Sequence, residues 1–305
     1  MPHYRSNNMI FVKKGFYTGY SALLSAESGL SVIWKWNQIR IWRHLHKPGD
    51  TVTERISHNH IHDIPYSGII LAGPGQLVEY NLIHHVMQKL NDGAGIYLNY
   101  EDTYGTLIRN NIIHDVYSPV QKSWGIYLDN FAEHVTVMNN LVYRTLGGGP
   151  MIHGARWNKW LNNIFVDGKI AQIRFNTYDD YSLHNIFERN IFFWHDPKAA
   201  FIKNLEEWRS FKSIEVSDYN LIYCSGGGPM KIINMKQIRG KYSKTLFDIK
   251  EFKDWQRKGY EFHSVVADPL FVDPEHDDYR LQKNSPAFRL GFRPIDFSYV
   301  GIQKK

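Results

Sequence analysis

A short phrase that returns along the chain constrains the fold more than any other feature. It consists of an Asn, one or two aliphatic residues, and then usually a His or an aromatic residue. Seven copies are separated by 22, 30, 29, 23, 27 and 30 residues, and their leading residues are Asn59, Asn81, Asn111, Asn140, Asn163, Asn190 and Asn220. A period in this range is typical of a solenoid, in which each repeat packs only on its neighbours. Residues at equivalent positions of successive repeats are therefore expected to be neighbours in space.

Each repeat contains two runs with the composition of β-strands. One run follows a Gly or another small residue, as in residues 95–99, and the other leads into the Asn phrase, as in residues 135–140. Both are rich in Ile, Val, Leu and Tyr and are bounded by turn-forming residues. Two or three strands per repeat predict an all-β chain that folds as a right-handed parallel β-helix. The recurring Asn residues are expected to stack inside it as a hydrogen-bonded ladder.

The repeat divides the chain into three parts. Residues 1–50 lack the phrase and are predicted to be an atypical N-terminal segment or truncated first coils, with one or two strands near residues 31–42. Residues 51–223 form the regular coils. Residues 224–305 are predicted to be a last coil and a cap with a short helix near residues 248–258, because the end of a solenoid exposes strand edges and apolar core.

Composition excludes some classes of protein and leaves others open. The 305 residues carry a formal net charge of +6, but the basic residues are scattered, which argues against a nucleic-acid partner. No stretch of 18 apolar residues predicts a membrane-spanning helix, and the N-terminus lacks a clear signal peptide. The single cysteine, Cys224, excludes an intrachain disulfide. Localisation and oligomeric state stay open.

Two sets of residues carry a resemblance to known proteins. One is the middle block formed by residues 92–97, 124–129 and His153, and the other is the tail formed by residues 267–273 and 285–287. With these motifs the chain resembles carbohydrate-active right-handed β-helix proteins, and among them β-helical glycoside hydrolases of the α-L-fucosidase and β-xylosidase type. The resemblance covers about residues 54–302. It implies a carbohydrate substrate and a secreted or periplasmic protein.

The repeat also predicts one chemically rich surface. Successive side chains of a strand point to opposite faces, so alternate residues of the Gly-Ile-Tyr-Leu runs should face outward. Neighbouring coils lie about 4.8 Å apart, which brings equivalent residues together. The residues expected on this outer face are Tyr97, Asn99, Tyr127, Asp129, Met151, His153, Arg174 and Asn176.

The hydrolase resemblance requires two carboxyl groups that flank the glycosidic bond. Asp129 is the first candidate because it lies at the centre of the predicted face, Asp92 is the second, and Glu101 is the reserve. Trp124 and Trp157 are candidates for stacking on a sugar ring. The predicted substrate-binding residues are His153, Asn99, Tyr97, Tyr127, Trp124, Trp157, Arg174 and Asn176.

Two other functions remain possible from the sequence. A polysaccharide lyase on the same fold needs a base and a group that neutralises a uronate, and His153, Arg156 and Arg174 fit these roles. A non-catalytic carbohydrate-binding solenoid fragment would need neither.

No metal site or other cofactor is predicted, although Ca²⁺ is compatible with the Asp- and Asn-rich loops. The recurring His62, His84 and His114 are interpreted as a stacked ladder that packs the repeats.

Overall fold

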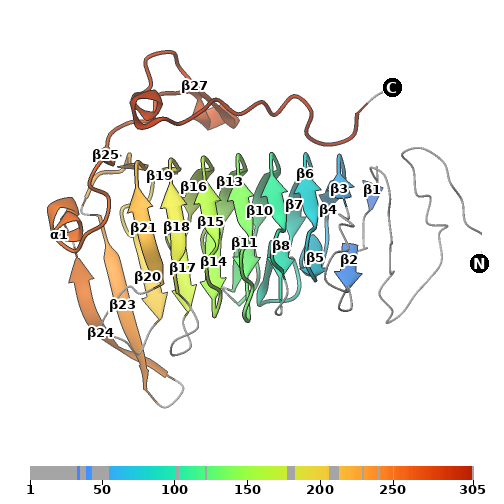
Figure 1. The fold of residues 1–305 in the computed structure, drawn as a ribbon, viewed down its shortest axis with the longest axis horizontal. Coiled ribbons are helices and arrows are strands. Elements are labelled where there is room, and N and C mark those ends of the chain that lie inside the picture. Colours follow the sequence, from blue (N-terminus) through green and yellow to red (C-terminus); the bar gives the residue numbers. More distant parts are fainter. Residues whose placement is uncertain are drawn as a thin grey trace, which may run out of the picture.

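The computed structural model describes residues 55–99, 103–120, 122–176, 183–205, 213–228, 230–238, 241–249 and 251–303, and the backbone of two short strands before them. The described chain winds into a right-handed parallel β-helix whose coils contribute strands to three long sheets (Figure 1). This confirms the predicted fold class. None of the described helices is long and apolar enough to cross a membrane.

We call the three long sheets A, B and C. Sheet A contains β2 (Ile39–Trp42), β5 (Ile69–Ala72), β8 (Gly93–Leu98), β11 (Ser123–Leu128), β14 (Pro150–His153), β17 (Ala171–Asn176), β20 (Ala200–Leu205), β23 (Ile232–Ile238) and β24 (Lys241–Ile249). Sheet B contains β1 (Ile33–Trp34), β4 (His60–His62), β7 (Leu82–Val86), β10 (Ile112–Val116), β13 (Leu141–Thr145), β16 (Ile164–Gly168), β19 (Ile191–Trp194), β22 (Leu221–Cys224) and β25 (Val265–Val266). Sheet C contains β3 (Arg55–Ser57), β6 (Leu77–Glu79), β9 (Leu107–Arg109), β12 (Thr136–Met138), β15 (Lys159–Leu161), β18 (Asn185–Glu188) and β21 (Ile214–Asp218).

Apolar side chains fill the inside of the coils in columns that run along the axis. In sheet B one such column is fully buried and consists of Ile61, Ile83, Ile113, Val142, Phe165, Phe192 and Ile222. Parallel pairing keeps these residues in register, so each stacks on its equivalent in the next coil. Burial of this continuous column supplies much of the driving force for folding.

The Asn residues of the repeat phrase form a buried ladder. From Asn59 to Asn220, each side-chain amide donates to the Oδ1 atom of the Asn in the next coil, at 2.7–3.1 Å. The last side chain, Asn220, donates instead to the carboxylate of Glu261 at 3.0 Å. Ser217 and Ser264 also donate to that carboxylate, each at 2.5 Å, and burial raises the pKa of Glu261.

Removing one member of the ladder should strongly destabilise the fold. Asn111→Ala deletes contacts to Asn81, Asn140 and the backbone carbonyls of Val78 and Arg109, all inside the core. Because several buried polar groups would lose their partners, we expect the free energy of unfolding to fall by about 3 kcal/mol or more. Urea denaturation measures this loss. The matched control, Asn91→Ala in an exposed turn, should change stability by less than about 0.5 kcal/mol.

The chain after the last coil has two parts. The short helix α1 (Phe252–Gln256) lies at the end of the coils, where Trp255 is fully buried against the core and stacks on Tyr260. Residues 263–303, which we call the C-terminal strap, then run back along the molecule toward its N-terminal end (Figure 1). The strap contains β26 (Phe271–Asp273), η1 (Pro274–His276), β27 (Asp278–Leu281) and η2 (Pro286–Leu290).

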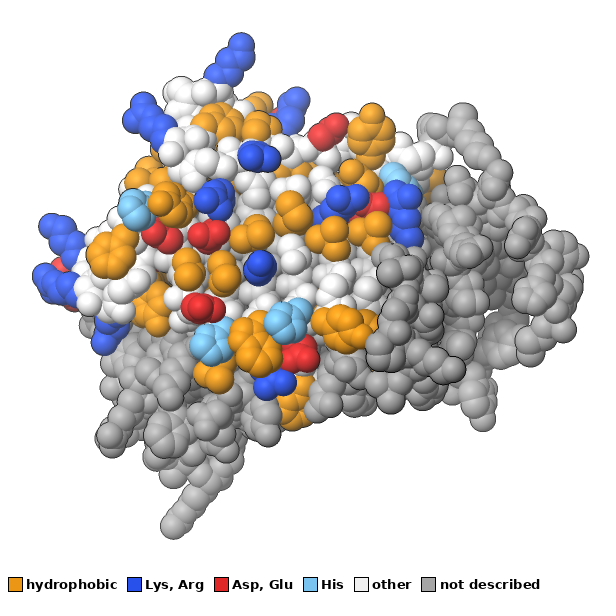
Figure 2. Space-filling model, viewed as in Figure 1, with side chains coloured by type: hydrophobic (Ala, Val, Ile, Leu, Met, Phe, Trp, Pro, Cys, Tyr) orange, Lys and Arg blue, Asp and Glu red, His pale blue; other side chains and the backbone are white. Residues whose placement is uncertain are grey.

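The strap covers the outer face of sheet B. Its apolar side chains form a second buried cluster with those of the sheet, which consists of Leu141, Tyr143, Ile164, Val166, Ile191, Phe193, Leu221, Phe271, Tyr279, Ala287, Leu290 and Phe292. Backbone hydrogen bonds attach the strap far from its origin, from Arg293 to the Asn162 side chain and from Gly301 to the carbonyl of Tyr80. Among the described residues, the apolar cluster on the outer face of sheet A contains no residue of the strap. Figure 2 shows basic and acidic side chains interspersed over the described part of the face in view.

Candidate active site

The predicted polar and aromatic residues lie in two adjacent columns on the outer face of sheet A. One column places Tyr97 beside Tyr127, Tyr127 beside Met151, and Met151 beside Arg174 in the parallel register. The other column lies at the strand ends, where His153 pairs in register with Asn176 and Asp129 follows β11 directly. The backbone N–H of Asp129 donates to Leu98 of the preceding coil, which keeps Asp129 in line.

Asp129 is the centre of a compact hydrogen-bonded cluster. The Tyr97 hydroxyl donates to its Oδ2 atom at 2.6 Å, and the backbone N–H of Asn130 donates to Oδ1 at 2.9 Å. His153 Nδ1 lies 2.7 Å from the same Oδ1 atom. Asp129 is only 5% exposed, so its two oxygen atoms are occupied inside the protein. This carboxylate is therefore suited to orienting its neighbours rather than to attacking a substrate.

His153 is held in a defined orientation by the same contacts. Because a carboxylate only accepts hydrogen bonds, the 2.7 Å contact assigns the proton to Nδ1 and the lone pair to Nε2. The Tyr127 hydroxyl lies 3.1 Å from Nδ1, so it contacts both members of the pair. His153 is partly exposed, at the end of β14. Its Nε2 atom is buried, and its Nδ1 atom lies next to the Tyr127 hydroxyl.

The two Tyr side chains are proton donors rather than bases. Burial, followed by the nearby Asp129 charge, raises the pKa of Tyr97 and of Tyr127 well above the usual value of a phenol. Both hydroxyls are therefore protonated at neutral pH. Tyr97 and Tyr127 also stack on one another with ring centroids 4.9 Å apart, which fixes their positions.

A pair of cationic side chains continues the Tyr column. Arg174 and Lys203 are in register on β17 and β20, and they follow Met151 in the next two coils. Burial, and then the charge of Arg174, lowers the pKa of Lys203. Among the residues that the structure describes, no carboxylate forms an ion pair with Lys203. Two adjacent cations on one face are suited to an anionic ligand.

The second carboxylate candidate, Asp92, is not among the hydrogen-bond partners of Asp129. Asp92 is exposed in the turn before β8, where its backbone contacts Lys122 and the Tyr66 hydroxyl. Its charge contributes to the raised pKa values of Tyr97 and Tyr127, which places it on the same side of the molecule. The reserve candidate Glu101 lies outside the described residues.

Neither Trp candidate presents an open ring face. Trp124 is 4% exposed and meets the edge of the Tyr127 ring. Trp157 is 38% exposed, but His134 and His184 from the neighbouring coils stack on it and the Arg156 guanidinium lies 4.4 Å from its ring centroid.

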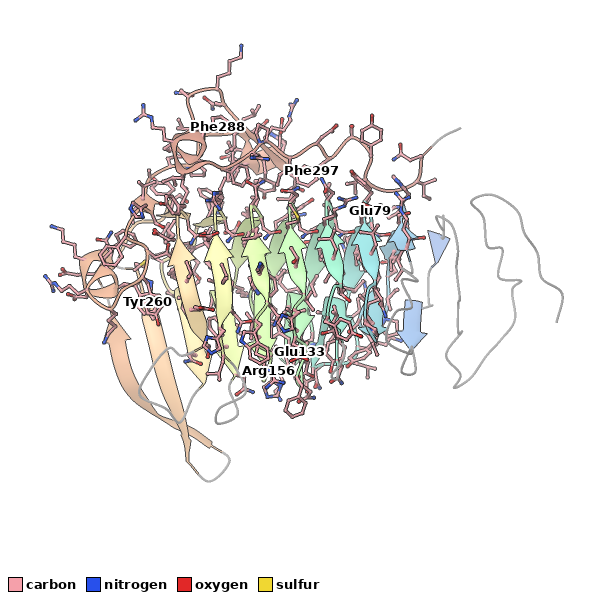
Figure 3. All side chains as sticks on the ribbon, viewed as in Figure 1. Glu79, Glu133, Arg156, Tyr260, Phe288 and Phe297 are labelled. Atoms are coloured by element: carbon pink, nitrogen blue, oxygen red, sulfur yellow. The ribbon has the colours of Figure 1, made fainter. Side chains whose placement is uncertain are left out.

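Three other residues that were predicted from the sequence are Arg156, Asn99 and Asn176. Arg156 also pairs with Glu133 at 2.9 Å, and both are labelled near the lower edge of the coils in Figure 3. Asn99 and Asn176 are partly exposed beside Asp129 and His153.

Lys203 is the one candidate that the sequence reading missed. It follows Arg174 by 29 residues, which is one repeat length, and comes directly after the run Ala200-Phe201-Ile202. That run lacks the Gly-Ile-Tyr signature of β8 and β11, and only the period points to Lys203.

The comparisons with known proteins agree with the fold. Residues 49–204 match the family described as "Right handed beta helix region", and the chain belongs to that family. A solved structure entitled "Crystal structure of pectate lyase Pel9A" is similar over 92% of this chain and 80% of that chain, with a TM-score of 0.50 and 9% identity. The Azotobacter vinelandii mannuronan C-5 epimerase AlgE4 A-module matches 79% of this chain and 63% of that chain, with a TM-score of 0.32 and 13% identity.

The family match establishes the family of the chain, and the likeness to the pectate lyase structure supports its fold. No curated protein sequence matches the chain significantly. The comparisons support the resemblance to right-handed β-helix proteins but not the closer resemblance to α-L-fucosidase and β-xylosidase type hydrolases.

Proposed function

We propose that the outer face of sheet A is the active site of a polysaccharide lyase that acts on an acidic polysaccharide. The observation that carries the proposal is the contact of Asp129, His153 and Tyr127 in line with the Arg174 and Lys203 pair. β-Elimination needs a base, an acid and a cationic group in one place. The similarity of the fold to a pectate lyase is consistent with this reaction.

Each residue of the site has one role in the proposed reaction. Arg174 and Lys203 bind the carboxylate of a uronate and withdraw charge from it, which acidifies the proton at C5. The base is His153 Nε2, which is buried in this structure, so substrate binding has to expose it before it takes that proton. The C5–H electrons form the C4=C5 double bond, the C4–O4 bond breaks, and the leaving oxygen takes the proton of the Tyr127 hydroxyl. The imidazolium then loses its Nε2 proton to water, and water returns a proton to the Tyr127 phenolate, which restores the starting tautomer and the phenol.

Asp129 and Tyr97 support this chemistry without contacting the reacting atoms. Asp129 fixes the tautomer of His153 and stabilises the imidazolium that forms. Tyr97 holds the other oxygen atom of Asp129 in place. Both are positioning residues in this proposal.

The hydrolase expected from the resemblance has weaker geometric support. Hydrolysis generally needs one carboxyl group as a proton donor and a second as a base or nucleophile. Asp129 is enclosed by three hydrogen-bonding groups, and no described contact joins it to Asp92.

An assay on two kinds of substrate separates the reactions. The full chain is incubated with polygalacturonate and with mannuronate and guluronate polymers, and separately with a panel of neutral aryl glycosides. We expect ultraviolet absorbance from a new C=C bond with at least one acidic polymer. Release of aryl alcohol without that absorbance would establish the hydrolase instead. Activity on neither kind of substrate would leave a carbohydrate-binding role.

The cationic pair should govern the affinity for an acidic substrate. For Arg174→Gln and Lys203→Gln we expect KM on the acidic polymer to rise about tenfold each, because each variant loses one charge-assisted contact of about 1.4 kcal/mol. Steady-state kinetics measures this change. The control Arg280→Gln removes an exposed cation on the strap and should leave KM within twofold. An unchanged KM in both site variants would show that Arg174 and Lys203 do not bind the carboxylate of a uronate.

A further inference from the structure

A second cluster of titratable side chains lies on a different sheet from the proposed active site. His60 and His62 of β4, His84 and His85 of β7, and His114 of β10 lie on the first coils of sheet B. We call these five residues the imidazole cluster. Parallel register pairs His62 with His84 and His84 with His114. The closest ring centroids are 4.6–5.2 Å apart, so the five rings form one continuous contact between three coils.

Two contacts inside the cluster require at least one uncharged ring in each pair. His84 Nε2 lies 2.7 Å from His60 Nε2, and His84 Nδ1 lies 2.6 Å from His85 Nδ1. An N–H···N hydrogen bond needs one nitrogen with a lone pair, whereas both nitrogens of an imidazolium carry protons. Protonation of His84 and its two partners therefore abolishes both bonds. His84 is the residue that connects the cluster, because both of its nitrogens are used.

The charged groups around the cluster do not balance five protonated rings. Asp63 and Asp115 contact Nδ1 of His62 and His114, at 2.9 and 2.6 Å. Asp115 is shared with Arg144, which also pairs with Asp277 of the strap. The nearby Tyr143 and Tyr279 stay neutral, because burial raises their pKa values. When protonated, five imidazoliums and Arg144 would face three carboxylates, with the rings about 5 Å apart.

We propose that the imidazole cluster is an acid-sensitive lock on the first coils: in its neutral form it joins β4, β7 and β10, and on protonation it releases them. Within the described part of the chain, no group of three or more His, Cys, Asp or Glu residues has the geometry to hold a metal ion. In this proposal the ligand of the cluster is the proton, because imidazole nitrogens take up protons near neutral pH.

The direction of the pH dependence follows from burial. Burial lowers the pKa of His60, His84 and His114, and that of His84 to about 4. The opened coils, with ordinary His pKa values near 6.5, bind more protons than the closed coils between these limits. The stability of the first coils is therefore fully present above about pH 6.5 and is lost as the pH falls toward 4.

Hydrogen exchange on the unmodified full chain tests the location of the effect. We expect the amides of residues 82–86 and 112–116 to exchange at least tenfold faster at pH 5.0 than at pH 7.5, after correction for the intrinsic pH dependence of exchange. Amides of β14 and β17 in sheet A should keep their protection. A uniform increase over all sheets, or no increase in the first coils, would overturn the proposal.

A double variant tests the cause. His84→Phe with His114→Phe keeps an aromatic ring in a column that already contains Phe193, but it cannot take up protons. We expect the Tm of the wild type to fall by about 5 °C or more between pH 7.5 and 5.0, and that of the variant by less than half as much. The control variant His276→Gln removes an exposed imidazole on η1 and should behave like the wild type. Equal pH dependence in the double variant and the wild type would contradict the proposal. Neither measurement depends on enzymatic activity.

Discussion

Replacement of His153 by Ala is expected to lower kcat on an acidic polysaccharide by about 10³-fold, the range measured for the loss of a general base. The physical reason is that His153 is the only cluster member with a basic nitrogen, since Tyr97 and Tyr127 are held protonated. Asp129→Asn should cost about 10²-fold, because the amide no longer fixes the tautomer of His153 but leaves the imidazole in place. Steady-state kinetics with each variant measures these losses.

A matched control makes the His153 experiment specific. His134→Ala removes an exposed imidazole from the same side of the coils, where it stacks on Trp157 rather than on the cluster. Its kcat should stay within threefold of the wild-type value. Melting curves of all variants establish that they are folded. If folded His153→Ala keeps more than a tenth of the wild-type kcat, the base is another residue and the proposed mechanism is wrong.

The second large effect concerns the strap. Phe292 is 5% exposed and packs in the buried cluster between the strap and the outer face of sheet B. Phe292→Ala should lower the free energy of unfolding by about 3–5 kcal/mol, since it removes a large apolar side chain and leaves a cavity. Urea denaturation followed by circular dichroism measures the change.

The chain offers its own control for this substitution. Phe262, just before the strap, is 64% exposed, so Phe262→Ala should change the free energy of unfolding by less than about 0.5 kcal/mol. Equal losses in the two variants would show that the strap does not contribute to stability through apolar packing.

The sequence predicted those parts of the molecule whose structure repeats from coil to coil. The Asn phrase sets the register, and alternation then places Tyr127 and Asp129 on one outer face, as the structure has them. Lys203 was missed because its strand has lost the signature of the earlier repeats, although it keeps their spacing. The path of the strap carries no periodic signal at all. The contact of Arg293 in the strap with Asn162 in the coils joins residues 131 positions apart, and no local sequence pattern predicts such a pairing.

The function was harder to infer than the fold for a related reason. The β-helix presents the same kinds of side chain for several reactions, so an Asp on the face does not specify its own role. The role depends on hydrogen-bond partners from other coils. Here Tyr97, His153 and Asn130 occupy the oxygen atoms of Asp129, which favours a supporting carboxylate over the acid or nucleophile that the hydrolase resemblance implied.

The Asn ladder is directional, and its C-terminal end is closed by the carboxylate of Glu261. Between the side chains, every amide donates to the Asn on its C-terminal side, so Asn220 needs an acceptor beyond it. Glu261 meets that need because a carboxylate accepts without donating. At the other end, the Asn59 carbonyl oxygen has no hydrogen-bond partner among the described residues. New coils could therefore be inserted among the repeats during evolution or design, provided that each brings its own Asn. A coil placed after Asn220 would first have to displace Glu261.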